Sequence, residues 1–264
     1  MKQQLQNALA SAQSVLVVTG AGISVASGIS PFRGSDPDAV WNNDILEKGT
    51  IRYFLTDTVD SWQWYLSRFD GIVDKEPNDA HHALVQLEKW AGKTKKDFML
   101  LTQNIDCLHR KAGSQRITEV HGRADRLRCV QFGCQNASPG GSVARTSVDF
   151  SPFRDAPNGK TLPRCELCGG LIRPHVLWFD EYYTEHVDYA YNQAMRFWTK
   201  ADIAIFIGTS FSVGITDSIY RDHLYRGVKM WSIDPFSQPE YPNINWIQEK
   251  AEVFLPDLVA QLGE

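Results

Sequence analysis

The sequence predicts an α/β protein built on a parallel sheet, with a smaller module inserted into it. Short apolar runs rich in β-branched residues recur along the chain, as expected of strands that are buried on both faces. Segments with helical periodicity separate several of these runs, which favours parallel strands joined by crossover helices. Four cysteines in two close pairs interrupt this alternation and mark the inserted module.

Five apolar runs predict strands, and one amphipathic segment predicts a helix ahead of them. The runs are residues 14–19, 98–102, 176–178, 203–207 and 228–233. Residues 2–12 place Leu5, Ala8 and Leu9 at helical spacing, which predicts the helix.

The same patterns divide the chain into three parts. A Rossmann-like domain is expected to comprise residues 1–34, 78–124 and 172–264. Residues 35–77 are rich in aromatic side chains at helical spacing and predict a helical insertion. Residues 125–171 carry the cysteine pairs.

Composition and charge narrow the functional class. The 264 residues are 43% hydrophobic and 22% charged, which is ordinary for a globular chain with a sizeable core. The formal net charge of −4 offers no footprint for nucleic acid, and Lys93, Lys95 and Lys96 are typical of a solvated loop. Neither a signal peptide nor a run of about 18 apolar residues is apparent, so we expect a cytoplasmic protein without a membrane span. We expect a monomer.

The two cysteine pairs predict a structural zinc site. The spacings Cys129-x4-Cys134 and Cys165-x2-Cys168 suit two metal-binding turns, and four thiolates suit tetrahedral Zn²⁺ with sulfur at about 2.3 Å. Such a closed site has no open coordination position, so we expect a zinc ribbon with a structural role. Four buried free cysteines are the alternative. Cys107 lies apart from the pairs and predicts a small packing residue, with a nucleophile as the alternative.

A glycine-rich turn follows the first predicted strand. Residues 19–24, TGAGIS, would let backbone N–H groups approach a pyrophosphate without interference from side chains. In a dinucleotide dehydrogenase a continuous helix would follow, but Gly28 and Pro31 disfavour one here. We therefore expect a loop that folds over a cofactor.

Polar residues follow the second predicted strand, and a histidine follows another short apolar segment. Residues 102–106, TQNID, lie where an open parallel sheet binds ligands, so Asn104 and Asp106 are candidates for holding hydroxyls and amides. Capping of a helix N-terminus by either side chain is the alternative. His121, beside Gly122, suits a general base because imidazole titrates near neutrality, although a lone histidine is more often structural.

These segments together resemble the sirtuin family of NAD-dependent protein deacylases, over nearly the whole chain from Val15 to about Leu262. The pattern is closest to the bacterial and desuccinylase-like branch. The motifs that carry the resemblance occur in the family's order: GAGIS at 20–24, SGI at 27–29, FR at 32–33, TQNID at 102–106, LH at 108–109, AG at 112–113, HG at 121–122, the four cysteines, RPHV at 173–176 and GTS at 208–210.

The resemblance implies that NAD is a co-substrate and assigns part of it to each motif. The nicotinamide-ribose and phosphate region would contact Gly20, Ala21, Gly22, Ser24, Phe32 and Arg33. The ribose and carboxamide would contact Gln103, Asn104, Ile105 and Asp106. The adenosine side would contact Gly208, Thr209, Ser210, Asp234 and Ala251, with Asp234 where the family usually has asparagine.

The resemblance also implies the reaction. The acyl-lysine carbonyl oxygen attacks C1′ of the nicotinamide ribose, nicotinamide leaves, and His121 accepts a ribose hydroxyl proton, with Asn104 as the second implied catalytic residue. The products would be free lysine, nicotinamide and O-acyl-ADP-ribose. The substrate peptide would add its backbone to a segment that comprises Val176, Leu177, Trp178 and Phe179.

Several positions bear on how this chain differs within the family. It has Pro31 where many members have aspartate and Asp180 where glycine is usual, and Val213-Gly214 stands where a valine, a variable residue and a proline are common. Tyr65-x-x-Arg68 matches the pair of sirtuins that prefer succinyl- or malonyl-lysine, and at i and i+3 of a helix the two side chains could hold a distal carboxylate. A packed tyrosine beside a solvated arginine, in an apolar tunnel, is the alternative.

Two other functions stay open on the sequence. An NAD glycohydrolase or ADP-ribosyltransferase would use water or a protein nucleophile at C1′ in place of the acyl oxygen. A non-catalytic zinc-ribbon binding module would leave His121 and residues 102–106 without a role.

Overall fold

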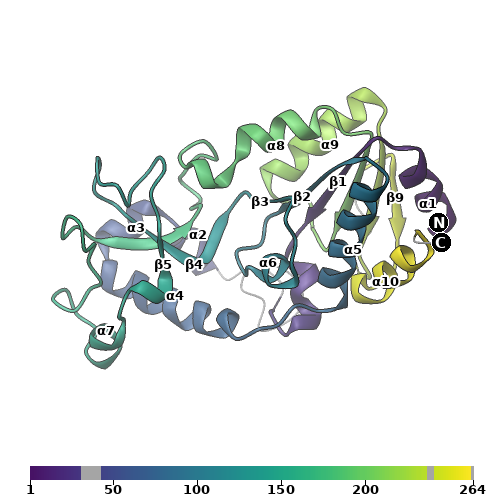
Figure 1. The fold of residues 1–264 in the computed structure, drawn as a ribbon. Coiled ribbons are helices and arrows are strands. Elements are labelled where there is room, and N and C mark those ends of the chain that lie inside the picture. The colour runs from purple at the N-terminus through teal and green to yellow at the C-terminus, as the bar shows by residue number, and fades with distance from the viewer. Residues whose placement is uncertain (31–42, 237–240, 263–264) are drawn as a thin grey trace.

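The computed structural model describes residues 1–30, 43–236 and 241–262. Within these ranges the chain forms a large parallel sheet covered by helices and a smaller antiparallel sheet with helices of its own (Figure 1). The predicted α/β class, a Rossmann-like sheet with a smaller module, is confirmed. None of the described helices combines the length and apolar character that a membrane crossing requires.

The large sheet has six parallel strands in the order β3-β2-β1-β7-β8-β9. They are β1 (Ser14–Thr19), β2 (Asp97–Thr102), β3 (Ile117–Glu119), β7 (Ile203–Ile207), β8 (Lys229–Ile233) and β9 (Ile244–Ile247). The chain order reverses between β1 and β7, because β2 and β3 extend the sheet on one side of β1 and β7 to β9 on the other. Ligands of open α/β sheets bind at such a switch point, outside the carboxyl ends of the strands.

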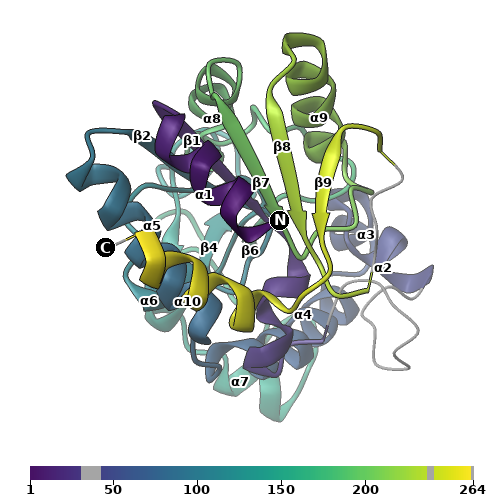
Figure 2. The same cartoon turned by 90° about the vertical axis from the view of Figure 1, so that its right-hand side faces the viewer.

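Helices cover both faces of the large sheet (Figure 2). One face carries α1 (Lys2–Ser11), α5 (Asp79–Lys93) and α10 (Ala251–Leu262), and the other carries α8 (Tyr191–Trp198) and α9 (Gly214–Arg226). Successive residues of β1 alternate between the two cores, with Val15 and Val17 in one and Leu16 and Val18 in the other. Because both faces are covered, the strand is apolar at successive positions, which is the pattern that predicted it.

The smaller sheet is antiparallel, in the order β5-β4-β6. Its strands are β4 (Gly122–Cys129), β5 (Val143–Ala144) and β6 (Ile172–Val176), and the nearby helices and 3₁₀ turns are α2 (Asn43–Lys48), α3 (Ile51–Thr56), α4 (Thr58–Val73), η2 (Arg145–Ser147), α7 (Ser151–Asp155) and η3 (Val187–Tyr189). Phe54 and Trp62 pack with Leu127 and Ile172 in one core, and Trp62 Nε1 donates to Ile172 O at 3.1 Å. The helical insertion and the cysteine segment therefore share a single core.

The apolar run at residues 176–178 is not a strand of the parallel sheet, and that prediction is wrong. Strand β6 ends at Val176 and pairs antiparallel with β4, with Val176 opposite Gly122. Val176 and Trp178 are buried in the core of the smaller module. An apolar run indicates that a segment is buried, but it does not indicate in which of the two cores the segment lies. The predicted division of the chain after residues 34, 77, 124 and 171 stays a prediction.

A buried ion-pair cluster fixes the loop that follows β6. Glu181 accepts hydrogen bonds from Arg128 of β4, at 2.8 Å, and from Arg173 of β6, and its Oε2 accepts from the Trp178 amide at 2.9 Å. The side chains of Arg128, Arg173 and Glu181 are all at most 5% exposed. Burial alone would raise the pKa of Glu181, but the hydrogen bonds and charges of the two guanidinium groups bring it below its ordinary value.

Glu181→Gln should lower the free energy of unfolding by about 3–5 kcal/mol, because it leaves two guanidinium groups buried without an anion. Urea unfolding followed by circular dichroism measures this loss. The control is Glu76→Gln, which removes a 79% exposed carboxylate from an ion pair with Lys111 and should cost about 1 kcal/mol or less. Equal losses in the two variants would contradict a special role for the buried cluster.

Candidate active site

Two glycine loops meet at the switch point of the large sheet. Gly20 and Gly22 follow β1, and Gly208 follows β7. The Gly22 amide donates to Gly208 O at 2.9 Å, and a Cβ added at Gly22 would lie 2.6 Å from Gly208 Cα. Gly208 has a φ of +57°, in the left-handed region that favours glycine. The loops therefore touch backbone to backbone, with no side chain between them.

The segment after the first glycine loop is short. It forms the 3₁₀ turn η1 (Ala21–Ser27), which ends at Gly28 with a φ of +76°. The prediction that no continuous helix follows the glycine turn is confirmed. Pro31, Phe32 and Arg33 lie outside the described residues.

The polar residues after β2 form a connected network with η1. Asn104 Nδ2 donates to Gly20 O and to Ser24 Oγ, both at 3.1 Å, and Ser24 Oγ donates to Asp106 Oδ2 at 2.7 Å. Asp106 is buried, which raises the pKa of its carboxyl group. Its Oδ1 accepts from the Leu108 amide at 3.0 Å, so it also holds the start of α6 (Leu108–Ala112). The binding and capping interpretations of Asp106 are thus compatible.

Gln103 extends this network to the loop after β7. Its Nε2 donates to Thr209 Oγ1 at 3.1 Å. Ser210 follows in the same loop, and its hydroxyl lies 2.7 Å from Ser212 Oγ. Three loops of the large sheet are therefore joined by side-chain hydrogen bonds at one edge.

Three other predicted NAD residues lie around this edge. Asp234 follows β8, and its carboxylate accepts from the Phe236 amide at 2.8 Å. Ala251 is buried at the start of α10, a helix that contacts η1. Ile105 packs against the core of the smaller module, so it points away from the core of the large sheet.

His121 lies between β3 of the large sheet and β4 of the smaller one. Its Nδ1 is 2.7 Å from Gln103 O. A carbonyl oxygen only accepts, so Nδ1 carries the proton and Nε2 presents the lone pair. Burial lowers the pKa of His121 below its ordinary value, with the Gln103 contact opposing. The imidazole is therefore neutral at pH 7 and able to accept a proton at Nε2.

Tyr183 is a site residue that the sequence interpretation missed. Its hydroxyl lies 3.2 Å from His121 Nε2, and the two rings are stacked with centroids 5.8 Å apart. Burial raises the pKa of Tyr183 to about 12, so the phenol is protonated and donates to Nε2. The only sequence signal was the tyrosine pair at 182–183, which carries no spacing relation to His121.

The segment after β6 connects His121 to the helical insertion. The Leu177 amide donates to His121 O at 2.8 Å, and the Phe179 amide donates to Gly49 O at 2.9 Å. Trp178 is buried, whereas Phe179 is 52% exposed. The predicted peptide-binding segment thus starts at the candidate base and ends at the surface beside α2.

The four cysteines come together as the spacing predicted. Cys129 Sγ lies 3.5 Å from Cys168 Sγ, Cys134 Sγ lies 3.7 Å from Cys165 Sγ, and all four sulfurs lie within 4.8 Å of one another. Tetrahedral Zn–S bonds of about 2.3 Å require sulfurs about 3.8 Å apart, so the cluster could hold a structural zinc ion. Cys107 is separate, and burial raises the pKa of its thiol to about 12, in keeping with a packing role.

Comparison with known proteins identifies the family. The Sir2 family profile matches residues 20–214. The chain belongs to the Sir2 family. An NAD-dependent protein deacylase of Thermus thermophilus is 34% identical over 241 residues, which cover 91% of this chain and 86% of the relative. The NAD-dependent deacetylase sir2E of Dictyostelium discoideum is 33% identical over 267 residues, which cover 98% and 76% respectively.

Solved Sir2 structures share the fold over the full length of this chain. A Sir2 homologue in complex with NAD has a TM-score of 0.81 and 31% identity, with 100% of this chain and 94% of that chain covered. A mutant Sir2 homologue in complex with 2′-O-acetyl-ADP-ribose has the same TM-score and identity, with 97% of that chain covered. The sirtuin resemblance predicted from the motifs is confirmed.

In this Sir2 chain the Tyr65 and Arg68 pair lies on α4 as the spacing predicted. Tyr65 is buried, and its hydroxyl accepts a hydrogen bond from Trp178 Nε1. The Arg68 guanidinium lies over the Trp64 ring, 3.7 Å from its centroid, and Nη1 donates to Trp64 O at 3.4 Å. Tyr65 therefore contacts the segment that includes Trp178, whereas Arg68 stacks on Trp64 of the same helix.

One position where this chain differs from the usual sirtuin pattern has a local explanation. Asp180 accepts from the amides of Ile51, at 2.8 Å, and Arg52, at 3.2 Å, so its carboxylate caps α3. A glycine at 180 could not provide that cap. Gly214 begins α9, and nothing in the structure explains why this segment departs from the usual pattern.

Metal analysis should find about one Zn²⁺ in the four-cysteine site, and Cys165→Ser should release it and destabilise the fold, because binding energy at such a site is folding energy. Zinc content and the melting temperature measure the two effects. Cys107→Ser is the matched control and should keep the ion. A metal-free wild-type protein with an unchanged melting temperature would contradict the assignment.

Proposed function

We infer that this chain is an NAD-dependent protein deacylase that transfers the acyl group of acyl-lysine to ADP-ribose. The observation that carries this inference is a neutral His121 whose Nδ1 is held by Gln103 O of the switch-point loops, which leaves the lone pair on Nε2. The names of its relatives and the NAD complex of a similar structure support the co-substrate. The expectations of a monomer and of no nucleic-acid partner stay predictions.

NAD would lie along the carboxyl edge of β1, β2 and β7. The glycine loops at 20–22 and 208 allow close approach of the phosphates, since a side chain at Gly22 would meet backbone. The amides and carboxylate of Gln103, Asn104 and Asp106 suit ribose hydroxyls and the nicotinamide carboxamide. Thr209, which Gln103 holds, faces the same loop junction.

The reaction is the one that the sirtuin resemblance implies, and this placement of NAD would suit it. The acyl-lysine carbonyl oxygen attacks C1′ of the nicotinamide ribose as nicotinamide leaves. His121 Nε2 accepts a proton from a ribose hydroxyl, and that oxygen attacks the acyl carbon. The lysine amine leaves as it gains a proton, and water adds to the remaining cyclic cation, so that O-acyl-ADP-ribose forms. Gln103 O holds Nδ1–H throughout, which keeps the lone pair on Nε2. The Leu177 amide donates to His121 O, which supports a role for residues 176–179 in holding the peptide near this histidine.

Product analysis separates this function from its rivals. Mass spectrometry of NAD with acyl-lysine peptides should find nicotinamide, free lysine and O-acyl-ADP-ribose. An NAD glycohydrolase or ADP-ribosyltransferase would instead give ADP-ribose or ADP-ribosylated protein with the acyl group untouched. A non-catalytic module would release no nicotinamide.

His121→Ala should lower kcat for deacylation by at least about a hundredfold, because general-base help is typically worth 10²–10⁴-fold. The variant should still fold and bind NAD, which isothermal titration calorimetry tests. His82→Ala changes an exposed histidine on α5 and should leave kcat unchanged. Wild-type-like deacylation by the His121 variant would rule out its role as base.

Tyr183→Phe should move the acid limb of the pH profile of kcat/KM to higher pH by about 0.5–1 unit. The Tyr183 hydroxyl stabilises the neutral imidazole, so its loss raises the pKa of His121 by the value of one hydrogen bond, about 1 kcal/mol. Activity falls as pH drops through that pKa, because the protonated base cannot accept a proton.

The control for this profile is Tyr182→Phe, because Tyr182 is 74% exposed. It should leave the acid limb in place. If Tyr183→Phe only scales the rate equally at every pH, the contact has no electrostatic effect on His121.

We propose further that Tyr65 and Arg68 favour acyl groups with a distal carboxylate, such as succinyl- and malonyl-lysine. A guanidinium–carboxylate contact in a partly desolvated tunnel is charge-assisted and worth on the order of 1.5–3 kcal/mol. Arg68 already stacks on Trp64, which would hold the guanidinium plane while it binds. Tyr65 is tied to Trp178, so its contribution requires that hydroxyl to bind the carboxylate as well.

Arg68→Met should reduce kcat/KM for succinyl-lysine peptide roughly ten- to a hundredfold while acetyl-lysine activity is retained. Steady-state kinetics on matched acetyl and succinyl peptides measure the ratio. Arg52→Met changes an exposed arginine on α3 and should leave the ratio unchanged. Equal losses on both peptides, or no succinyl activity in the wild type, would contradict the acidic-acyl preference.

A further inference from the structure

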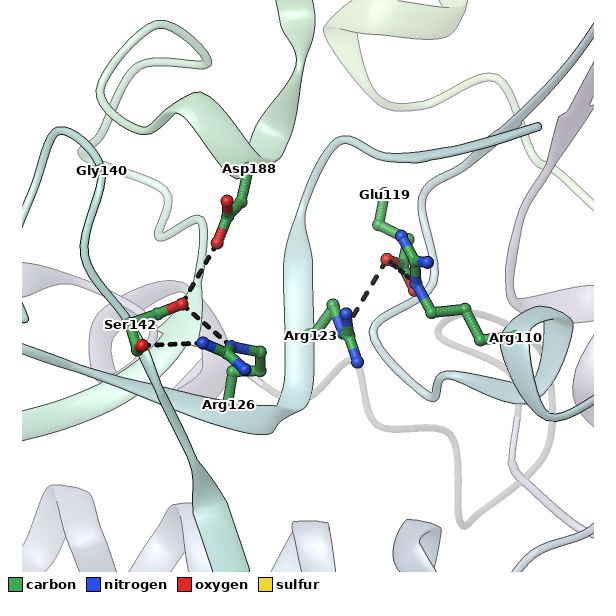
Figure 3. A pocket seen from close by; sticks show the side chains of 7 residues that line it. All are labelled: Arg110, Glu119, Arg123, Arg126, Gly140, Ser142 and Asp188. Carbon is green, nitrogen blue, oxygen red and sulfur yellow. Dashed lines mark hydrogen bonds and ion pairs between the residues drawn. The ribbon is translucent and has the colours of Figure 1, made fainter. Parts of the chain in front are cut away.

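A second group of metal-ligating side chains lies on and after β6, and it includes none of the four cysteines. His175 is on β6, His186 precedes η3, and Asp188 is in η3. One ring nitrogen of each histidine and one carboxylate oxygen lie within 4.8 Å of one another. Asp188 also borders a cavity of about 290 Å³ (Figure 3). The cavity is lined by Arg110, Glu119, Arg123, Arg126, Gly140, Ser142 and Asp188.

The buried imidazole of His175 lacks hydrogen-bond partners among the described residues. Its side chain is 0% exposed, and neither ring nitrogen has a hydrogen-bond partner among them. Nε2 lies 3.2 Å from Asp188 Oδ2 without forming a well-directed hydrogen bond. An unsatisfied buried polar group costs about 1–3 kcal/mol, so such an atom calls for an ion or a water molecule.

His186 is oriented as a metal ligand would be. Its Nε2–H donates to Gly141 O at 3.0 Å, which leaves the lone pair on Nδ1 facing Asp188 Oδ2 at 3.7 Å. Metal-bound histidines almost always donate their other ring N–H to a carbonyl or carboxylate in this way. The Asp188 amide donates to Nδ1 at 3.1 Å, and an ion would replace that hydrogen bond at a cost of about 1 kcal/mol.

The distances from each histidine nitrogen to the carboxylate oxygen suit zinc. Bonds of about 2.0–2.2 Å in a tetrahedral site place neighbouring ligands about 3.3–3.5 Å apart, between the 3.2 Å and 3.7 Å observed here. Two histidines and one carboxylate leave a fourth position open. Ser142 Oγ donates to the same Asp188 oxygen at 3.2 Å, as Figure 3 shows, and would orient the carboxylate. Asp188 is 41% exposed, so an ion can enter from solvent.

Nearby charges set the strength of the site. The positive charges of Arg128, Arg173 and Arg126 act on His175 and repel a cation. Glu181 pairs with Arg128 and Arg173, and Arg126 is hydrogen-bonded to Ser142, so the repulsion is reduced but not removed. We therefore expect weaker binding than at four thiolates.

We propose that His175, His186 and Asp188 form a second divalent-metal site, which takes Zn²⁺ or Co²⁺ and keeps an open coordination position. Imidazole and carboxylate together favour these ions over Mg²⁺ and Ca²⁺, which prefer oxygen ligands. An ion there would tie η3 and the Gly141 segment to β6, directly before the segment 176–179.

Cobalt titration of the zinc-loaded full-length protein tests this site. After one equivalent of Zn²⁺ has filled the four cysteines, added Co²⁺ should bind one further ion per chain. Its visible ligand-field bands should lack the sulfur-to-cobalt charge-transfer band of a thiolate site. Asp188→Asn should abolish this second binding. His82→Asn changes an exposed side chain of α5 and should retain it.

Thermal unfolding gives an independent readout. Added Zn²⁺ should raise the melting temperature of the zinc-loaded wild type and of His82→Asn, but not of Asp188→Asn, because ions that bind only the native state stabilise it. If wild type binds no second ion, if Asp188→Asn binds it equally well, or if the cobalt spectrum shows thiolate bands, the proposal is wrong and water satisfies His175. None of these outcomes depends on deacylase activity.

Discussion

The backbone contact between the turn at 20–22 and Gly208 is the constraint on which the rest of the site depends. Strands β1 and β7 are neighbours in the sheet, and the loops that follow them touch with no side chain between them. A Cβ at Gly20 would lie 2.7 Å from Gly208 O, so any other residue would push the loops apart. The loop after β2 binds both sides of this contact, since Asn104 donates to Gly20 O and Gln103 donates to Thr209 Oγ1.

This contact makes a buried polar network possible at the end of an apolar sheet. Ser24, Asn104 and Asp106 satisfy one another, which offsets the cost of removing them from water. Thr19, the last residue of β1, is likewise paired with His109 Nε2 at 3.0 Å. A preorganised set of amides and carboxylate oxygens is what polar parts of a dinucleotide need, so the network serves stability and binding together.

His121, the proposed base, lies between the two sheets. His121 follows β3 and precedes β4, and Gly122 turns the chain between them with a φ of +79° at a point where a Cβ would lie 2.2 Å from His175 O. Gln103, which follows β2, fixes Nδ1, while Tyr183, in the loop after β6 that packs against the core of the large sheet, contacts Nε2. Since Nε2 has one lone pair, the Tyr183 hydroxyl must withdraw when a substrate hydroxyl donates. The position of the loop after β6 is therefore coupled to the protonation of His121.

The sequence by itself determined the α/β class, four of the strands of the large sheet, the family and the four-cysteine cluster. Each depends on local information: continuous apolar runs, glycines at a turn, and cysteine spacings that fit one coordination geometry. Only the tertiary structure placed residues 172–176 in the smaller sheet, brought Tyr183 to His121 and gathered His175, His186 and Asp188. Those contacts join segments that no repeating sequence pattern relates to one another. They depend on how the two cores pack together.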